Sequence, residues 1–366
     1  MSATSAIYDR QIRLWGLETQ SKISTTKVLL YGYHSGLLEE LAKDLVLTGI
    51  GTLVIGEYSG ETLGKPTLVT YLGQDLEELV KALRILNPNA QIHTMDSYIE
   101  ENLPGRFEKG NDVQTLSRLV ETKAFGIFGL IGEKVGSPIA LSLDRICRDN
   151  NTLFAYVETV GALGFLILDL GSNYTYRSMN KSHPSSKARN IANNKSQVIT
   201  LDDSDEENEQ KSQPSFVENT LLYPTLEEVF SSILSQCSSQ KYLIFLTFMR
   251  QYNEQCHANS HPDVQEMQKQ LEMFLQLHNI VTRHSELQSL YNFCSFMNVE
   301  MISVSSCLAG ILGREIVKLI SRNEKPIFNT FIFDAFACTG SIVQVASRVD
   351  RKRSRQDEAD SIVYDI

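Results

Sequence analysis

The chain has 366 residues, of which 42% are hydrophobic and 21% are charged, and its formal net charge is −10. This composition predicts a globular protein with a sizeable core, and the negative charge disfavours broad nucleic-acid binding. No apolar run approaches the roughly 20 residues that a membrane span needs, so we expect no membrane partner.

The segment from Tyr8 to Gly16 reads Tyr-Asp-Arg-Gln-Ile-Arg-Leu-Trp-Gly and contains the only tryptophan of the chain. Arg10 and Arg13 stand three residues apart and share one face of a predicted helix. Planar guanidinium groups suit polyphosphates because they donate two hydrogen bonds at once, although an ordinary amphipathic helix with solvated arginines has the same pattern. We expect three apolar residues to anchor this helix: Ile12, Trp15 and Leu17.

Strands and helices are predicted to alternate through most of the remaining chain. The apolar run at 27–32 is typical of a buried parallel strand, and it is followed by a helical pattern and a second strand at 52–55. Strand, glycine turn, helix and strand form the first unit of a nucleotide-binding sheet. Further strands are predicted near 91–95, 125–131, 153–157, 165–168 and 328–334. The fold class is therefore α/β, a doubly wound, Rossmann-like, adenylation-type domain.

The glycine loop of this unit matches a dinucleotide-binding fingerprint poorly. A dinucleotide fingerprint needs closely spaced glycines, so that the backbone can approach phosphates at the start of the helix. Here Gly32 and Gly36 stand four residues apart, and the bulky Leu38 follows. Glu57 ends the second strand, where a ribose-binding acid would lie in a competent site, but an acid is also common in turns. The signal for bound nucleotide is weak.

Residues 171–215 are poor in apolar side chains and are predicted to form a disordered acidic linker. An apolar stretch followed by acids interrupts it, and such a segment is suited to adding a strand to the sheet edge of a basic partner. It resembles a SUMO-interacting motif, although short apolar-acidic matches also arise by chance. The residues proposed to bind a partner are Val198, Ile199, Leu201, Asp202 and Asp203.

A small helical insertion is predicted for 216–300, opening with a capping box formed by Thr225 and Glu228. The chain is predicted to return to the α/β domain at 301–347. This domain is therefore formed by two segments, of which 1–170 is the first. A helix at 305–320 contains Gly310 and Gly313, which predict close backbone packing. The tail at 348–366 carries a basic cluster, which indicates either a nuclear-import signal or a solvated terminus. Six scattered cysteines without a C-x-x-C pair argue against a metal site.

Four blocks of the chain, at 8–20, 28–57, 86–88 and 308–334, resemble the ubiquitin-activating enzyme family in order and spacing. The length and the insertion of about four helices are similar to the small, non-cysteine subunits of its heterodimeric SUMO-activating members. The corresponding subunits for the cullin-modifying ubiquitin-like protein carry a larger helical insertion and are the alternative. An oxidoreductase is disfavoured by the glycine loop, and a purely structural adaptor remains open.

In this family the adenylating half binds ATP, magnesium and the C-terminal carboxylate of the modifier, and a cysteine then takes the acyl group as a thioester. Where a competent half has a basic residue, this chain reads Gln74-Asp75, and 132–138 lacks the metal-binding aspartate motif of the family. The resemblance therefore implies a regulatory subunit that is inactive alone and holds no cofactor. ATP and Mg belong to a homologous large subunit, to which Arg10, and more weakly Arg13, would be offered in trans.

The resemblance also implies the other partners and the location of the protein. SUMO would bind to the heterodimer, and the SUMO-conjugating enzyme would be an indirect partner. The protein is expected in the nucleus and also in the cytoplasm.

Overall fold

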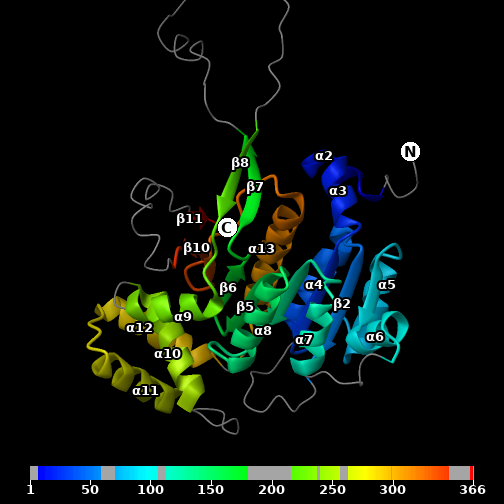
Figure 1. Cartoon of the computed structure of the whole chain (residues 1–366). Coiled ribbons are helices and arrows are strands. Elements are labelled where there is room, and N and C mark those ends of the chain that lie inside the picture. The colour runs from blue at the N-terminus through cyan, green and yellow to red at the C-terminus, as the bar shows by residue number, and fades with distance from the viewer. Residues whose placement is uncertain are drawn as a thin grey trace, which may run out of the picture.

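The computed structural model describes residues 7–58, 71–105, 113–179, 216–236, 240–255, 263–297, 299–345 and 363–365. Within these residues, nine strands form one central sheet (Figure 1). Its parallel half contains, in spatial order, β3 (Gln91–Thr94), β2 (Thr52–Glu57), β1 (Lys27–Gly32), β4 (Ile127–Ile131) and β5 (Leu153–Val160). The antiparallel half continues with β6 (Leu163–Asp169), β9 (Thr330–Asp334), β10 (Thr339–Val343) and β11 (Val363–Asp365).

The order of the parallel strands is that of a Rossmann-like sheet, and the predicted fold class is confirmed. The strand order reverses between β1 and β4, which is where ligands bind in open α/β sheets. In the parallel register, Gly32 at the end of β1 lies opposite Glu57 of β2 and Ile131 of β4. Any nucleotide site of this chain would therefore be formed by the residues that follow these three strands.

Helices cover both faces of the sheet, and each face has its own apolar core (Figure 1). One face is covered by α4 (Gly36–Thr48), α5 (Leu76–Leu86) and α13 (Ile302–Ser321). The other is covered by α6 (Met95–Asn102), α7 (Val113–Glu121) and α8 (Pro138–Asp149). Neither α6 nor α7 was predicted; both are short, with eight and nine residues, although α7 buries Leu116, Leu119 and Val120 along one face.

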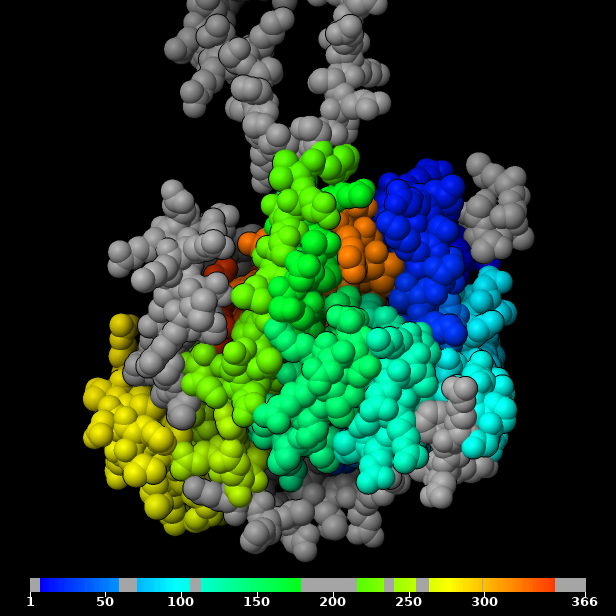
Figure 2. All heavy atoms as spheres, viewed as in Figure 1, coloured from blue at the N-terminus to red at the C-terminus, as the bar shows by residue number. Residues whose placement is uncertain are grey.

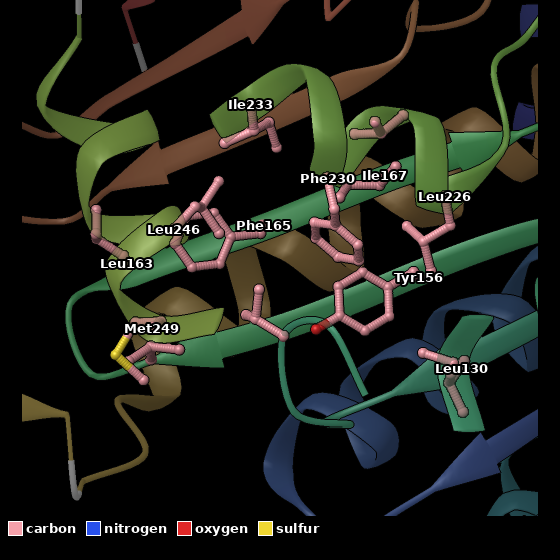
Figure 3. Close-up of a cluster of buried hydrophobic side chains, with 14 of the residues drawn as sticks. Leu130, Tyr156, Leu163, Phe165, Ile167, Leu226, Phe230, Ile233, Leu246 and Met249 are labelled. Carbon is pink, nitrogen blue, oxygen red and sulfur yellow. The ribbon is translucent and has the colours of Figure 1, made fainter. Parts of the chain in front are cut away.

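The helical insertion packs on the same core as α6 to α8. Its helices are α9 (Leu226–Gln236), α10 (Lys241–Gln255), α11 (Val264–Leu277) and α12 (His284–Phe296). The capping box is present, because the backbone N–H of Thr225 donates to Glu228 Oε2 at 2.8 Å and that of Glu228 donates to Thr225 Oγ1 at 3.2 Å. Figure 3 shows Phe230 of α9 over Tyr156 of β5, with ring centroids 6.2 Å apart.

The stretch from Gly171 onward begins with a strand, where composition predicted irregular structure. Strand β7 (Tyr174–Met179) pairs antiparallel with β8 (Phe216–Leu221) in a two-stranded ribbon. This pairing joins the two ends of a long excursion, and local composition cannot reveal such a long-range contact. The alternating tyrosines Tyr174 and Tyr176 are buried and are the local signal that the composition argument overlooked.

Two further expectations are corrected by the structure. Gly310 lies on the exposed face of α13, with nothing within 4 Å of where a Cβ would stand, so this glycine serves no close packing. The core face of α13 is formed instead by residues such as Ala309 and Leu312. Residues 363–365, predicted to belong to a flexible tail, pair with β10 as strand β11. Among the described helices, none is long and apolar enough to cross a membrane.

Candidate functional site

The leader segment folds into two short helices, α2 (Asp9–Trp15) and α3 (Leu17–Ile23). Gly16 joins them with φ 87°, a left-handed value that favours glycine. The side-chain amide of Asn87 donates to the hydroxyl oxygen of Tyr8 at 2.7 Å and to the carbonyl oxygen of Val46 at 2.8 Å. Tyr8 and Asn87 are both buried, so these bonds fix the start of α2 against the end of α4.

A second set of hydrogen bonds holds the end of α2. Trp15 Nε1 donates to Gln20 Oε1 at 3.0 Å, and Gln20 Nε2 donates to the carbonyl oxygen of Thr48 at 3.0 Å. Gln11 Nε2 donates to the carbonyl oxygen of Leu47 at 3.3 Å. Trp15 is half-buried against the core beneath α4 and α13. The leader is therefore attached to the C-terminal end of α4 at several points.

The two arginines point away from this attachment. Both Arg10 and Arg13 are exposed, as the sequence predicted. Arg13 forms an ion pair with Asp9 of 2.9 Å, whereas Arg10 has no ion-pair partner among the residues that the structure describes. The expectation that Leu17 anchors the helix is wrong, because the turn at Gly16 directs this side chain outward and leaves it 67% exposed.

Exposed apolar side chains occur on the leader and in the region of the β7–β8 ribbon. Figure 1 shows α2 and α3 on one side of α13 and the β7–β8 ribbon on the other, and Figure 2 shows the surface of α13 between them. The backbone N–H of Arg177 in β7 donates to the carbonyl oxygen of Arg322 at 2.7 Å, so the ribbon is attached to the residue that follows α13. The exposed apolar residues of α2, α3 and the ribbon region are Leu14, Leu17, Phe216, Val217 and Leu222.

The chain's own nucleotide crevice lies at the opposite end of α4. The first backbone N–H groups of this helix are those that would bind a phosphate. Those of Gly36 and Leu37 donate instead to the two carboxylate oxygens of Glu300, at 3.2 and 2.9 Å. That of Leu38 donates to Ser35 Oγ at 3.3 Å, so all three donors have internal acceptors.

Aromatic and acidic side chains fill the surroundings of this crevice. The rings of Tyr33, after β1, and Tyr58, after β2, pack with centroids 4.6 Å apart. Burial, together with repulsion from Glu133 and Glu158, raises the pKa of Tyr33 to about 12. Burial also raises the pKa of Glu57, the residue at the ribose position. The backbone donors at the start of α4 that would face a phosphate thus have acceptors within this chain.

Three of the four cysteines in the described part of the chain are unsuited to act as nucleophiles. Burial raises the pKa of Cys147, of Cys294 (to about 12) and of Cys307, whereas a nucleophilic cysteine needs a lowered pKa. In the same residues no group of three or more His, Cys, Asp or Glu side chains could hold a metal ion. The proposed SUMO-interacting residues, Val198 to Asp203, lie outside the described residues.

Sequence reasoning missed Glu300, Tyr8 and Asn87 as site residues. Glu300 and Leu37 are 263 residues apart, and no spacing rule connects them. The segments that hold Tyr8 and Asn87 did stand out as separate blocks, but the hydrogen bond between them joins positions 79 residues apart. In each case a distant side chain satisfies a local hydrogen-bonding group.

Curated relatives match the chain over nearly its whole length, whereas no family model matches it. SUMO-activating enzyme subunit 1 of Xenopus laevis is 27% identical over 369 residues, covering 94% of this chain and 96% of that protein. The subunit 1 of Homo sapiens is 25% identical, covering 92% and 94%. That of Dictyostelium discoideum is 24% identical and covers 92% of each. The resemblance noted in the four sequence blocks is confirmed.

A crystal structure of selenomethionine PaaA is 14% identical, with a TM-score of 0.48, and covers 91% of this chain and 80% of that chain. A likeness this low carries no argument about function.

Proposed function

We propose that this chain, which matches SUMO-activating enzyme subunit 1 proteins over more than nine-tenths of their length, is the regulatory subunit of a heterodimeric SUMO-activating enzyme. A homologous large subunit would bind ATP and Mg, adenylate SUMO and carry the cysteine that forms the thioester. This chain alone would be inactive. The heterodimer would pass SUMO to the conjugating enzyme, and we place it in the nucleus and also in the cytoplasm.

The observation that carries this proposal is the position of Arg10 relative to the chain's own crevice. The leader is attached at Val46, Leu47 and Thr48, at the C-terminal end of α4, whereas the crevice lies at its N-terminal end. Thirteen residues of helix separate the two ends, which corresponds to about 20 Å. An arginine side chain cannot span this distance, so a phosphate bound by Arg10 must belong to another molecule.

The proposed role of Arg10 is to stabilise the negative charge on the phosphates of ATP in the large subunit during adenylation. Its guanidinium group is always charged and donates in a planar fork that matches phosphate oxygens. A donor fixed before the reaction stabilises the transition state more than one that must first be ordered, and the bonds of Tyr8 and Trp15 supply this order. Arg13 is the weaker candidate, because Asp9 already neutralises it.

We further propose that the apolar face around α2, α3 and the β7–β8 ribbon contacts the large subunit. Its exposed side chains include Leu14 (78%), Leu17 (67%) and Phe216 (53%). Exposed apolar surface around a fixed arginine is typical of a protein interface. Contact on this face would bring Arg10 to the partner without closing this chain's own crevice.

The stretch with Val198, Ile199 and Leu201 is a separate proposal for SUMO binding. Titrating a peptide of residues 194–210 into isotope-labelled SUMO tests it, with chemical-shift changes at the edge of the SUMO sheet as the expected result. A control peptide with these three residues replaced by alanine is expected to give no change. Equal spectra for both peptides would contradict this proposal and leave the heterodimer proposal intact.

ATP–pyrophosphate exchange tests the proposed function. The full chain alone is expected to give no exchange, and addition of the SUMO-activating large subunit is expected to give exchange that depends on SUMO. Exchange by the isolated chain would contradict the proposal. Exchange that depends on the cullin-modifying ubiquitin-like protein and its large subunit, but not on SUMO, would identify the alternative family branch.

A further inference from the structure

The carboxylate of Glu300 occupies the position of a phosphate at the start of α4. Its Oε2 accepts from the backbone N–H of Gly36 at 3.2 Å, and its Oε1 accepts from that of Leu37 at 2.9 Å. Two successive N–H groups at a helix N-terminus are the donors that hold phosphate in nucleotide-binding folds. The side chain of Glu300 is only 4% exposed, so this contact is part of the interior.

Glu300 is held in place by its position in the chain. It lies two residues before α13, and Ser305 in the first turn of α13 donates from Oγ to Glu300 Oε1 at 2.8 Å. Helix α13 packs against α4 through Leu308, Ala309 and Leu312, which belong to the same apolar core as Leu37 and Leu41. Displacing the carboxylate would therefore disturb the junction between the helical insertion and the sheet.

We infer that Glu300 is an internal substitute for phosphate, which closes this chain's nucleotide crevice and fixes α13 to the glycine loop. The remaining donor of the helix N-terminus is already bonded to Ser35, so an external phosphate finds no free N–H among the first three of α4. A phosphate would also bring negative charge next to a buried carboxylate, which is unfavourable. This inference does not depend on the large subunit, because every contact lies within one chain.

Removing the carboxylate should turn the closed crevice into an anion site. Glu300→Ala frees the N–H groups of Gly36 and Leu37 and leaves the space of the carboxylate empty. Inorganic pyrophosphate is the probe, added to the full-length chain at constant ionic strength, with the unfolding temperature and equilibrium dialysis as readouts. A ligand that binds only the folded state raises its stability by mass action.

A matched control is available on the same helix. Glu315 is also buried, at 2% exposure, and its Oε2 accepts from the backbone N–H of Ile327 at 2.7 Å, away from the start of α4. Glu315→Ala removes an equally buried carboxylate without freeing the donors of α4. It also breaks the 2.6 Å ion pair of Glu315 with Lys318, so it reports the loss of stability from removing a buried carboxylate together with that pair.

The expected result has three parts. The wild-type chain and Glu315→Ala bind no pyrophosphate and unfold at a temperature that pyrophosphate does not change, whereas Glu300→Ala binds it saturably and unfolds at a higher temperature. If Glu300→Ala does not fold, Glu300→Ser replaces it, because serine is also too short to reach the two N–H groups and leaves the space of the carboxylate open to pyrophosphate. Equal pyrophosphate binding by wild-type chain, or a folded Glu300 variant without any response, would overturn the inference. Neither result depends on exchange activity in the heterodimer.

Discussion

The hydroxyl oxygen of Tyr8 accepts a hydrogen bond of 2.7 Å from the side-chain amide of Asn87. This bond joins the leader to the turn after α5 and, through the bond of Asn87 to Val46, to the end of α4. Gly49 lies beneath the Tyr8 ring, where a Cβ would approach the ring to 2.7 Å. The backbone position of Arg10 is therefore set by buried contacts two residues earlier in the chain.

Tyr8→Phe should loosen the leader with little change to the core. Removing one buried hydrogen-bonding hydroxyl costs about 0.5–1.5 kcal/mol of the free energy of unfolding. Denaturant unfolding of the full chain measures this, and adenylation by the heterodimer should slow because Arg10 is less well positioned. Tyr291→Phe is the control, since its hydroxyl bonds to the exposed Glu272 on the helical insertion. Equal adenylation by Tyr8→Phe and wild type would show that this bond does not position Arg10.

Gly310→Ala should stabilise the isolated chain. Gly310 is an exposed, helical residue with open space around the Cβ position, so alanine lowers the entropy cost of folding by roughly 0.5–1 kcal/mol without a clash. Gly164→Ala provides the contrast, because its Cβ would approach Leu308 Cδ1 to 2.5 Å. Unfolding free energies of the two variants should change in opposite directions. A destabilised Gly310→Ala would show that this position of α13 is not open.

Asp144 should make the stability of the chain depend on pH. Its Oδ2 accepts from the backbone N–H of Leu226 at 2.9 Å, and burial, with repulsion from Asp169, raises its pKa from 3.8 to about 8. The folded state holds this proton more tightly than the unfolded state does. The contribution of the protonated side chain to the free energy of unfolding is therefore complete below pH 3.8 and is lost as the pH rises through about 8.

Asp144→Asn should flatten this dependence, because asparagine keeps an acceptor for Leu226 and does not ionise. Unfolding free energies of wild type are expected to fall by up to roughly 1.4 kcal/mol per pH unit within this window relative to the variant. Asp149→Asn, at an exposed position on α8, is the control and should follow the wild type. Parallel curves for wild type and Asp144→Asn would contradict the buried, protonated state of this side chain.

The parallel half of the sheet could be predicted because its strands are continuous apolar runs followed by turns, as at Val28–Gly32. The start of α9 could also be predicted, since Thr225 and Glu228 form a local capping box. The exposure of Arg10 followed from the same helical periodicity. These features depend on neighbours within a few residues, and the sequence contains that information directly.

The features that could not be predicted depend on distant contacts. Strand β7 forms only because β8 lies beside it, and α4 receives its carboxylate from Glu300 after the whole insertion. Leu17 seemed an anchor because a single straight helix was expected, whereas Gly16 divides the leader in two. A glycine in an apolar helix likewise suggested close packing, yet Gly310 faces outward.

The most direct test of the account is adenylation by heterodimers that carry Arg10→Ala. The rate of SUMO-dependent ATP–pyrophosphate exchange should fall roughly 10²–10³-fold, as for loss of one preorganised donor to a transition state, while the heterodimer stays intact by size-exclusion chromatography. Arg13→Ala, which removes a solvent-exposed ion pair with Asp9, is the matched control. Its exchange rate should fall far less than that of Arg10→Ala. An intact Arg10→Ala heterodimer with an unchanged exchange rate would contradict the account and favour a purely structural adaptor.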